Sequence, residues 1–296
     1  MVFRRLVTYG EESTYGEAPG DVSRWVGGVT SFNGGVELVG EKVAVLTAGR
    51  GTWTVATGVD ISPNISFYPQ TAQFLKYAFG ETTNTGTSPP YTHVLEISDG
   101  YELPSVSLLE HRLGGGGHGY LYTGCRADKL TLSWEADGLL KASMDFKALR
   151  ATKTTTLPTP TPDRRDYFKA SSKTVEINGV EVGYVVSGTV TVSNNHVSFP
   201  RSGDYVTRHV AGLAEAEAEL ELFYVDSSIV ELMLGKTRFD VRVRFSRSSQ
   251  DYLEIFLDDC VCSVEAELPA EGELVQTISL KPSGVRIEAV DDIPAY

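Results

Sequence analysis

Residues 214–222 read Ala-Glu-Ala-Glu-Ala-Glu-Leu-Glu-Leu, and the geometry of this stretch decides the fold class. Its residue types favour helices, but on a helix the apolar side chains would scatter around the whole circumference. On a strand they sort cleanly, with alanines and leucines on one face. The other face carries Glu215, Glu217, Glu219 and Glu221, which we call the glutamate row. The stretch is therefore predicted to be a half-buried β-strand.

The same two-residue period recurs along the chain in short runs that are separated by turn-forming residues. β-Branched and aromatic side chains are dense in these runs, as a half-buried pleated surface favours. Two short helices are expected at residues 70–79 and 226–234, because each run ends at a glycine. The sequence predicts a mainly β protein. The clearest runs are residues 52–57, 190–193, 239–245 and 264–268.

Prolines at positions 158, 160 and 162 mark a break near the middle of the chain. Alternating prolines block helix formation and strand pairing, and they favour an extended spacer. We therefore expect a first domain at residues 1–150, a Thr/Pro linker at 151–167 and a second domain at 168–296.

The two halves look like copies of each other. Shifting residues 27–51 by 161 positions places them on residues 188–212 without a gap, and seven of 25 positions are then identical. The later features repeat in order: a strand (52–57 matched with 214–222), a short helix, a hairpin and a cysteine-containing strand. The pattern predicts two duplicated β-sandwich or barrel domains, each with one short helix. The first copy carries an insertion around residues 81–103.

Charge and composition exclude several functions. Lys and Arg number 26 against 39 Asp and Glu, which gives a net charge of −13. Such a balance disfavours sequence-independent nucleic-acid binding and docking on an anionic membrane. No apolar run reaches the length of a membrane span or a signal peptide, so we expect no membrane partner and synthesis in a cytoplasm.

Signals for catalysis, metals or cofactors are poor. Cys125, Cys260 and Cys262 are too few and wrongly spaced for a disulfide framework or a zinc knuckle, and read as strand residues. The glycine run at 114–117 lacks the Lys-Ser/Thr ending of a phosphate loop. No catalytic residue, metal ligand or cofactor is therefore predicted.

Several segments occur together in a recognisable order. They are Thr-Tyr-Gly-Glu-Glu-Ser-Thr-Tyr-Gly-Glu-Ala-Pro at 8–19, Gly-Thr-Trp-Thr at 51–54, Tyr-Thr-Gly-Cys-Arg at 122–126, the segment at 130–140 and the run at 186–195. In this arrangement the chain resembles the major tail tube proteins of long-tailed bacteriophages and tailed archaeal viruses.

The resemblance implies a structural virion protein with no catalytic residues. Its β-sandwich or barrel, flanked by a short helix, would form stacked rings whose inner strands join into one barrel. The channel would be acidic, so that DNA passes without specific binding. Other tail proteins would be partners, and the protein would reside in the virion tail.

The expected duplication bears on the ring. Closed rings fix the number of tube domains rather than the number of chains, so three duplicated chains would complete a ring of six. We expect a trimer; the alternative is a hexamer in which one half decorates the outer wall. Aromatic side chains on polar segments are candidate subunit contacts, because such residues anchor partners. These are Tyr9, Tyr15, Tyr91 and Tyr101.

The glutamate row is the candidate lining of the channel. Residues 156–296 carry a net charge of −10 against −3 for residues 1–155, so the second half is the more acidic. Two alternatives remain for the row: an outer solvated face, or pairing with Arg242 and Arg244.

Two other functions remain open. A soluble β-sandwich module that binds carbohydrate or protein would need exposed aromatics on one face, for which Trp25, Trp53 and Trp134 are available. A β-rich hydrolase would use scattered carboxylates.

Overall fold

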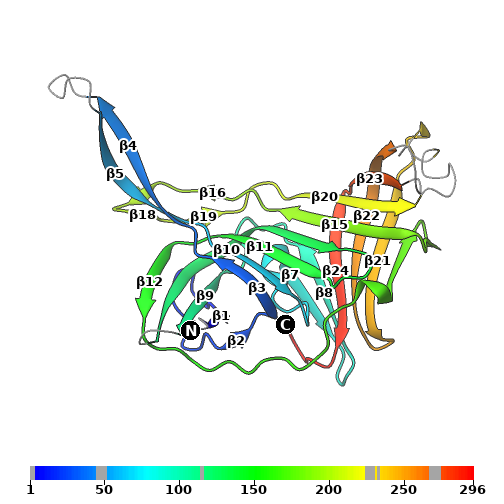
Figure 1. Cartoon of the computed structure of the whole chain (residues 1–296), viewed down its shortest axis with the longest axis horizontal. Coiled ribbons are helices and arrows are strands. Elements are labelled where there is room, and N and C mark those ends of the chain that lie inside the picture. The colour runs from blue at the N-terminus through cyan, green and yellow to red at the C-terminus, as the bar shows by residue number, and fades with distance from the viewer. Residues whose placement is uncertain (1–3, 45–51, 114–116, 224–230, 232–233, 267–274) are drawn as a thin grey trace.

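The computed structural model describes residues 4–44, 52–113, 117–223, 231, 234–266 and 275–296. Regular structure in these residues is β, apart from helix α1 (Lys76–Phe79), a short 3-10 turn (Ala170–Ser172) and fragments near 231–234. The prediction of a mainly β protein is confirmed. Figure 1 shows the strands arranged as packed sheets with one long hairpin that extends away from them.

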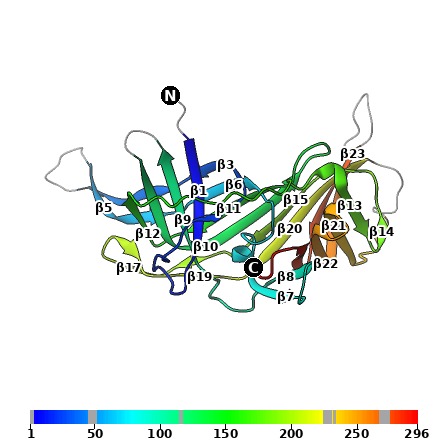
Figure 2. The same ribbon diagram turned by 90° about the horizontal axis from the view of Figure 1, so that it is seen from below.

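One antiparallel sheet of eight strands runs through both halves of the chain, and we call it the central sheet. Strands from opposite sides of the proline-rich segment, β10 and β15, pair in its middle, as Figure 2 also shows. The two halves therefore share one sheet. Its order is β3 (Gly28–Asn33), β6 (Asn64–Tyr68), β11 (Lys141–Lys147), β10 (His118–Trp134), β15 (Val185–Ser193), β20 (Glu215–Phe223), β23 (Val275–Lys281) and β22 (Asp251–Ala266).

Two outer sheets cover the buried face of the central sheet. The first is built from residues of the first half, and the second joins strands of the second half to β7 and β8 from the first. The apolar side chains between the layers form one continuous core. The first outer sheet has the order β2 (Arg24–Trp25), β1 (Arg4–Glu11), β9 (Val106–Leu113), β10 and β12 (Arg150–Thr154). The second has the order β14 (Val180–Glu181), β13 (Lys173–Ile177), β21 (Phe239–Ser248), β22, β24 (Gly284–Asp291), β8 (Tyr91–Ile97) and β7 (Gly80–Thr85).

Strands β10 and β22 are long because each belongs to an outer sheet and then to the central sheet. Each strand bends at a residue with a positive φ, which is 65° at Gly124 in β10 and 54° at Asp259 in β22. A buried cysteine follows each bend, and its thiol lies 3.5 Å from the carbonyl oxygen three residues earlier. The two strands thus pass between layers by the same local geometry.

The hairpin of β4 (Val36–Ala44) and β5 (Thr52–Ile61) extends away from the two layers, at the upper left of Figure 1. At its base, β5 meets the short strands β17 (Arg201–Ser202) and β18 (Tyr205–Val206), and β16 (Val197–Ser198) pairs with β19 (His209–Val210) nearby. The expected match between residues 52–57 and 214–222 is wrong. Strand β5 pairs with β4 and β18, outside the central sheet. The strand whose position resembles that of β20 is β6, because each is second in its half of the central sheet's order, after β15 or β3.

Helix α1 begins at Lys76, later than expected, because residues 70–75 form turns. The amide of Leu75 donates to the carbonyl of Ala72 at 2.9 Å, and the side chain of Gln70 is engaged elsewhere, by the carbonyls of Asp163 and Arg165. The helix ends at Gly80, whose φ is 90°. The second expected helix, at 226–234, lies largely outside the described residues.

The proline-rich segment is fastened to the body rather than free. Gln70 holds its backbone at 3.1 and 2.6 Å, and the Arg247 guanidinium donates to the carbonyl of Asp166 at 2.7 Å. Residues 150–154, at its start, form strand β12. The division into domains at 151–167 stays a prediction, since the central sheet continues across it.

Candidate functional site

The central sheet buries one face and leaves the other open, and this open face is the candidate site. On β20, Ala218, Leu220 and Leu222 are buried, whereas the glutamate row points to the open side. Glu221 is half-buried and the other three glutamates are exposed. The predicted strand at 214–222 is confirmed, with its two faces sorted as the alternation requires.

Hydroxyl side chains surround the glutamate row on both neighbouring strands. On β15 the row faces Ser187, Thr189, Thr191 and Ser193, and on β23 it faces Thr277 and Ser279. The Ser187 hydroxyl donates to Glu221 Oε2 at 2.7 Å. By the same register Lys281, at the end of β23, stands opposite Glu217. The other three glutamates face hydroxyl side chains, so the row keeps a net negative charge toward the open side.

Pairing of the row with Arg242 and Arg244 is wrong. Both arginines lie on β21, in the second outer sheet. Arg244 Nη2 is 2.6 Å from a Glu254 oxygen, and Arg242 Nη1 is 4.0 Å from Glu176. The alternation of residues 239–245 correctly places the two arginines on one face, but that face belongs to another sheet.

The first half of the open face carries lysines instead of glutamates. Lys129 on β10 and Lys141 and Lys147 on β11 share this face, and we call them the lysine group. Among the described residues, no carboxylate oxygen lies within 4.0 Å of the Lys129 or Lys141 amine. Sequence reasoning missed this group, although the alternation Lys-Ala-Ser-Met-Asp-Phe-Lys at 141–147 was a usable signal.

Hydroxyls also tie the two halves of the open face together. Thr131 Oγ1 of β10 is 3.4 Å from Thr191 Oγ1 of β15, across the junction of the halves. Ser66 and Ser143 hydroxyls are 3.2 Å apart, and Asn64 donates to Asp145. The open face is therefore polar across the junction of the two halves.

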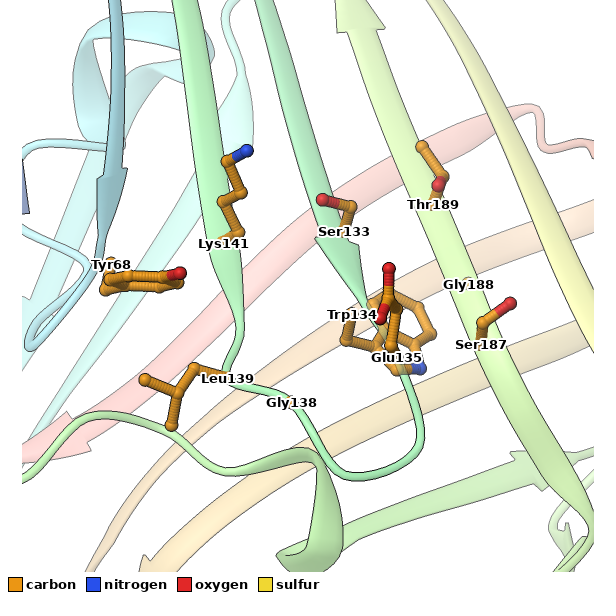
Figure 3. Close-up of a pocket in the computed structure, with 10 residues that line it drawn as sticks. All are labelled: Tyr68, Ser133, Trp134, Glu135, Gly138, Leu139, Lys141, Ser187, Gly188 and Thr189. Carbon is orange, nitrogen blue, oxygen red and sulfur yellow. The ribbon is translucent and has the colours of Figure 1, made fainter. Parts of the chain in front are cut away.

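A cavity of about 420 Å³ opens on this face near the end of β10 (Figure 3). Trp134, at its base, is only 2% exposed and packs against Phe245 with ring centroids 5.3 Å apart. Figure 3 shows Lys141, Ser133 and Thr189 on three adjacent strands above it. Since the indole belongs to the core, it presents no open stacking surface to a sugar.

The other tryptophans lie elsewhere. Trp25 is on β2 and donates its indole N–H to Gln70 at 2.8 Å, and Trp53 is on β5, its side chain outside the described residues. The three tryptophans thus come from three different sheets, which does not favour a carbohydrate-binding face.

The four candidate contact tyrosines have different surroundings. Tyr9 is fully buried against Phe74, with ring centroids 4.8 Å apart, and burial raises its pKa to about 12. The prediction that Tyr9 is a subunit contact is therefore wrong, because the alternation along β1 points its side chain into the core. Tyr15 is half-buried, and its hydroxyl accepts from the His209 amide at 3.0 Å. Tyr91 is half-buried on β8, whereas Tyr101 is 69% exposed.

The described part of the chain shows neither a reactive thiol nor a cluster of metal-ligating side chains. Burial raises the pKa of the Cys125 thiol well above its usual range, and it raises the pKa of Cys260 to about 12. Within the described ranges, no three His, Cys, Asp or Glu side chains come together as metal ligands. No helix of these residues has the length and apolar character needed to cross a membrane.

Fold and site together define a structural β-sandwich protein whose main feature is a broad, hydroxyl-rich sheet face. Residues 3–283 match the model of the phage tail tube protein family, and the chain belongs to this family. A search of curated proteins finds no match to it. The protein is accordingly a structural component of the virion tail that self-assembles and associates with other tail proteins.

Proposed function

We propose that copies of this chain form stacked rings whose inner wall is the central sheet, and that DNA passes through the resulting channel. The observation that carries the proposal is the pair of free edges on this sheet. Within the described residues, β3 pairs only with β6, and the last six residues of β22 pair only with β23. Free strand edges are templates for pairing with another chain.

The contact between β10 and β15 is the model for the contact between chains. It joins the two halves within one chain, edge to edge. Pairing of β22 with β3 of the next copy would repeat it, because β22 holds the place of β10 and β3 that of β15. The sheet would then continue from chain to chain and close on itself.

The strand pairings support duplication of the two halves, residues 1–150 and 168–296. The order β1, β9, β10, β12 in one outer sheet is matched by β13, β21, β22, β24 in the other. Likewise β3, β6, β11, β10 is matched by β15, β20, β23, β22. Three such chains would give a ring with approximate six-fold symmetry, which we prefer to a hexamer.

Contacts between rings would use the hairpin and the segment packed at its base. Exposed apolar side chains gather there, and contiguous exposed apolar surface marks interaction sites. Tyr101 lies next to this region, since its carbonyl accepts from the Ala211 amide at 2.9 Å. Tyr15 and Tyr91 would contribute at the same boundaries. The exposed apolar residues are Val36, Leu38, Val55, Val197, Phe199 and Leu213.

The glutamate row would face the DNA and keep it from adhering. Each phosphate that a protein neutralises releases counterions and gains affinity, so a wall with exposed carboxylates limits retention of the DNA. No sequence-specific contact is needed. The chain would be made in the host cytoplasm before it joins the tail.

Cross-linking of engineered cysteines tests the ring. Ser31→Cys on β3 and Ser263→Cys on β22 would be joined between copies by a short flexible bis-maleimide. We expect the double variant to give covalent species that end at three chains, whereas each single variant controls for the native cysteines. A ladder that ends at six supports the hexamer. Monodisperse monomers in electron micrographs of tail preparations, with no cross-link, would overturn the proposal.

A further inference from the structure

We infer that the channel wall carries two unlike stripes, and that the phosphates of passing DNA contact the lysine group rather than the glutamate row. The inference rests on the proposed channel. It concerns which part of the open face meets the DNA, and it follows from where charges lie on the central sheet.

The two groups of charge stand on different strands of the same face. The lysine group lies on β10 and β11, and the glutamate row lies on β20. Lys129 and Lys141 are exposed, so their amines are available to a ligand. Asp145 on β11 lies opposite Lys129 in the strand register, and it accepts a hydrogen bond from Asn64.

A neutral strand separates the stripes. β15 lies between β10 and β20 and presents Ser187, Thr189, Thr191 and Ser193 on this face. Neighbouring strands are spaced about 4.8 Å apart, so Lys129 on β10, the lysine of the group nearest to β20, stands roughly 10 Å from the glutamate row. That distance exceeds the Debye length of about 8 Å at physiological ionic strength. The stripes therefore do not cancel each other's fields.

Among the residues that the structure describes, the acidic stripe occurs once in each chain. β6 holds the place of β20 in the first half, yet its open-face residues are Asn64, Ser66 and Tyr68. A ring of three chains would thus carry three acidic and three basic stripes. Its charge would have three-fold symmetry even though its strands approach six-fold symmetry.

This distribution suits a duplex that must slide. Phosphates gain free energy only beside the lysine group, and the glutamate row repels them from the neighbouring wall. Lys281, on β23, is the other described cation of this face, and it lines a cavity of about 330 Å³ with Glu217 and Glu219. Its position next to the glutamates leaves Lys129 and Lys141 as the main phosphate contacts.

Photo-cross-linking in particles arrested during ejection tests the stripe directly. A photo-activated amino acid would replace Lys129, Glu219 or Lys153; the last is exposed on β12 and away from the open face. We expect strong cross-links to DNA from position 129, few from 219 and none from 153. Equal cross-linking at 129 and 219, or cross-linking at 219 alone, would overturn the inference while leaving the channel intact. No cross-link at either position would overturn the channel itself.

Ejection kinetics give an independent readout. Removing two phosphate contacts with the pair Lys129→Gln and Lys141→Gln should make ejection several-fold faster at low salt. The difference should vanish at high salt, because each lost contact reduces the salt exponent by about 0.9. The matched control, Lys153→Gln with Lys169→Gln, removes two exposed lysines elsewhere and should leave the rate unchanged. Identical rates for both pairs in particles with normal tails would contradict the lysine stripe.

Discussion

Strands β10 and β22 make the same bend with different residues, and the reason lies in what covers each bend. In β10, a Cβ on Gly124 would lie 2.7 Å from the Leu149 side chain, so no larger residue fits. In β22, Asp259 adopts the same left-handed conformation while exposed, and its amide donates to Asp240 Oδ1 at 3.0 Å. The backbone path is common to both halves, whereas packing around it selects the residue.

The outer sheets differ in the same way. Chain segments cover the first: a Cβ on Gly119 would lie 2.9 Å from Leu157 of the proline-rich segment and 3.1 Å from Leu109. The second faces outward with charged side chains, and the Arg286 guanidinium stacks 4.2 Å from the Phe256 ring. In the first half, the proline-rich segment covers the outer sheet and excludes water from it. In the second half, the outer sheet is open and presents charged side chains to water.

The largest effect is expected at the two bends. Gly124→Asp should reduce the free energy of unfolding by at least about 3 kcal/mol, because it combines a positive φ, a steric clash and a buried charge. Asp259→Gly should change it by less than about 1 kcal/mol. Denaturant unfolding of both variants measures the difference. Similar losses of unfolding free energy in the two variants would show that packing around the bend does not decide which residue occupies it.

Glu12 fastens the N-terminal arm, which we define as residues 12–19, to the first bend. The second bend, at the exposed Asp259, has no such cover among the described residues. Glu12 Oε1 accepts from Ser107 at 2.6 Å and from the Gly124 amide at 2.8 Å, and Oε2 accepts from Ser105 and the Gly16 amide. Glu12→Gln should cost about 2 kcal/mol, since an amide group cannot accept all four hydrogen bonds.

The control for Glu12 is Glu37→Gln, on exposed β4, which should cost less than about 0.5 kcal/mol. Both free energies come from the same denaturant experiment. A cost for Glu12→Gln as small as that of the control would mean that the arm is not fastened by this carboxylate.

Acid should destabilise the end of β24 but not the matching end of β12. Burial alone would raise the pKa of Asp291, but hydrogen bonds from His93, Tyr296 and the Ile293 amide outweigh it and lower that pKa below its usual value. A lowered carboxyl pKa stabilises the fold above pH 4 or so, and this stability is lost as the pH falls through the lowered value.

Asp291→Asn should therefore lower the free energy of unfolding at pH 7 by about 1–2 kcal/mol and flatten its decline below about pH 4. Asp292→Asn, at an exposed neighbour, is the control. Unfolding free energies from pH 7 to pH 3 provide the measurement. An unchanged acid limb in Asp291→Asn would assign the acid sensitivity to other groups.

The smallest effect is expected on the open face. Glu219→Gln on β20 should change the free energy of unfolding by less than about 0.5 kcal/mol, because exposed cross-strand charges contribute little. Thermal unfolding at low and high salt is the measurement. A loss above 1.5 kcal/mol or so would make the glutamate row a structural feature.

Local alternation is enough to predict several elements of this protein. It identifies the strand at 214–222 and its two faces, the two hairpins that lead into the cysteine-containing strands, and the scarcity of helix. These predictions succeed because side chains on a strand point alternately to opposite sides, whatever surrounds the strand. Applied to residues 141–147, the same rule also predicts that Lys141 and Lys147 share one face of a strand.

Alternation does not say which strand lies opposite a given face. It places Arg242 and Arg244 on one side of a strand, but their partners Glu176 and Glu254 come from β13 and β22. It likewise cannot reveal that Tyr9 faces the core, where Phe74 packs against its ring. The pairing of β10 with β15 and of β8 with β24 joins segments far apart in the sequence. Such contacts depend on the combined packing of many side chains, so they emerge only when the whole chain folds.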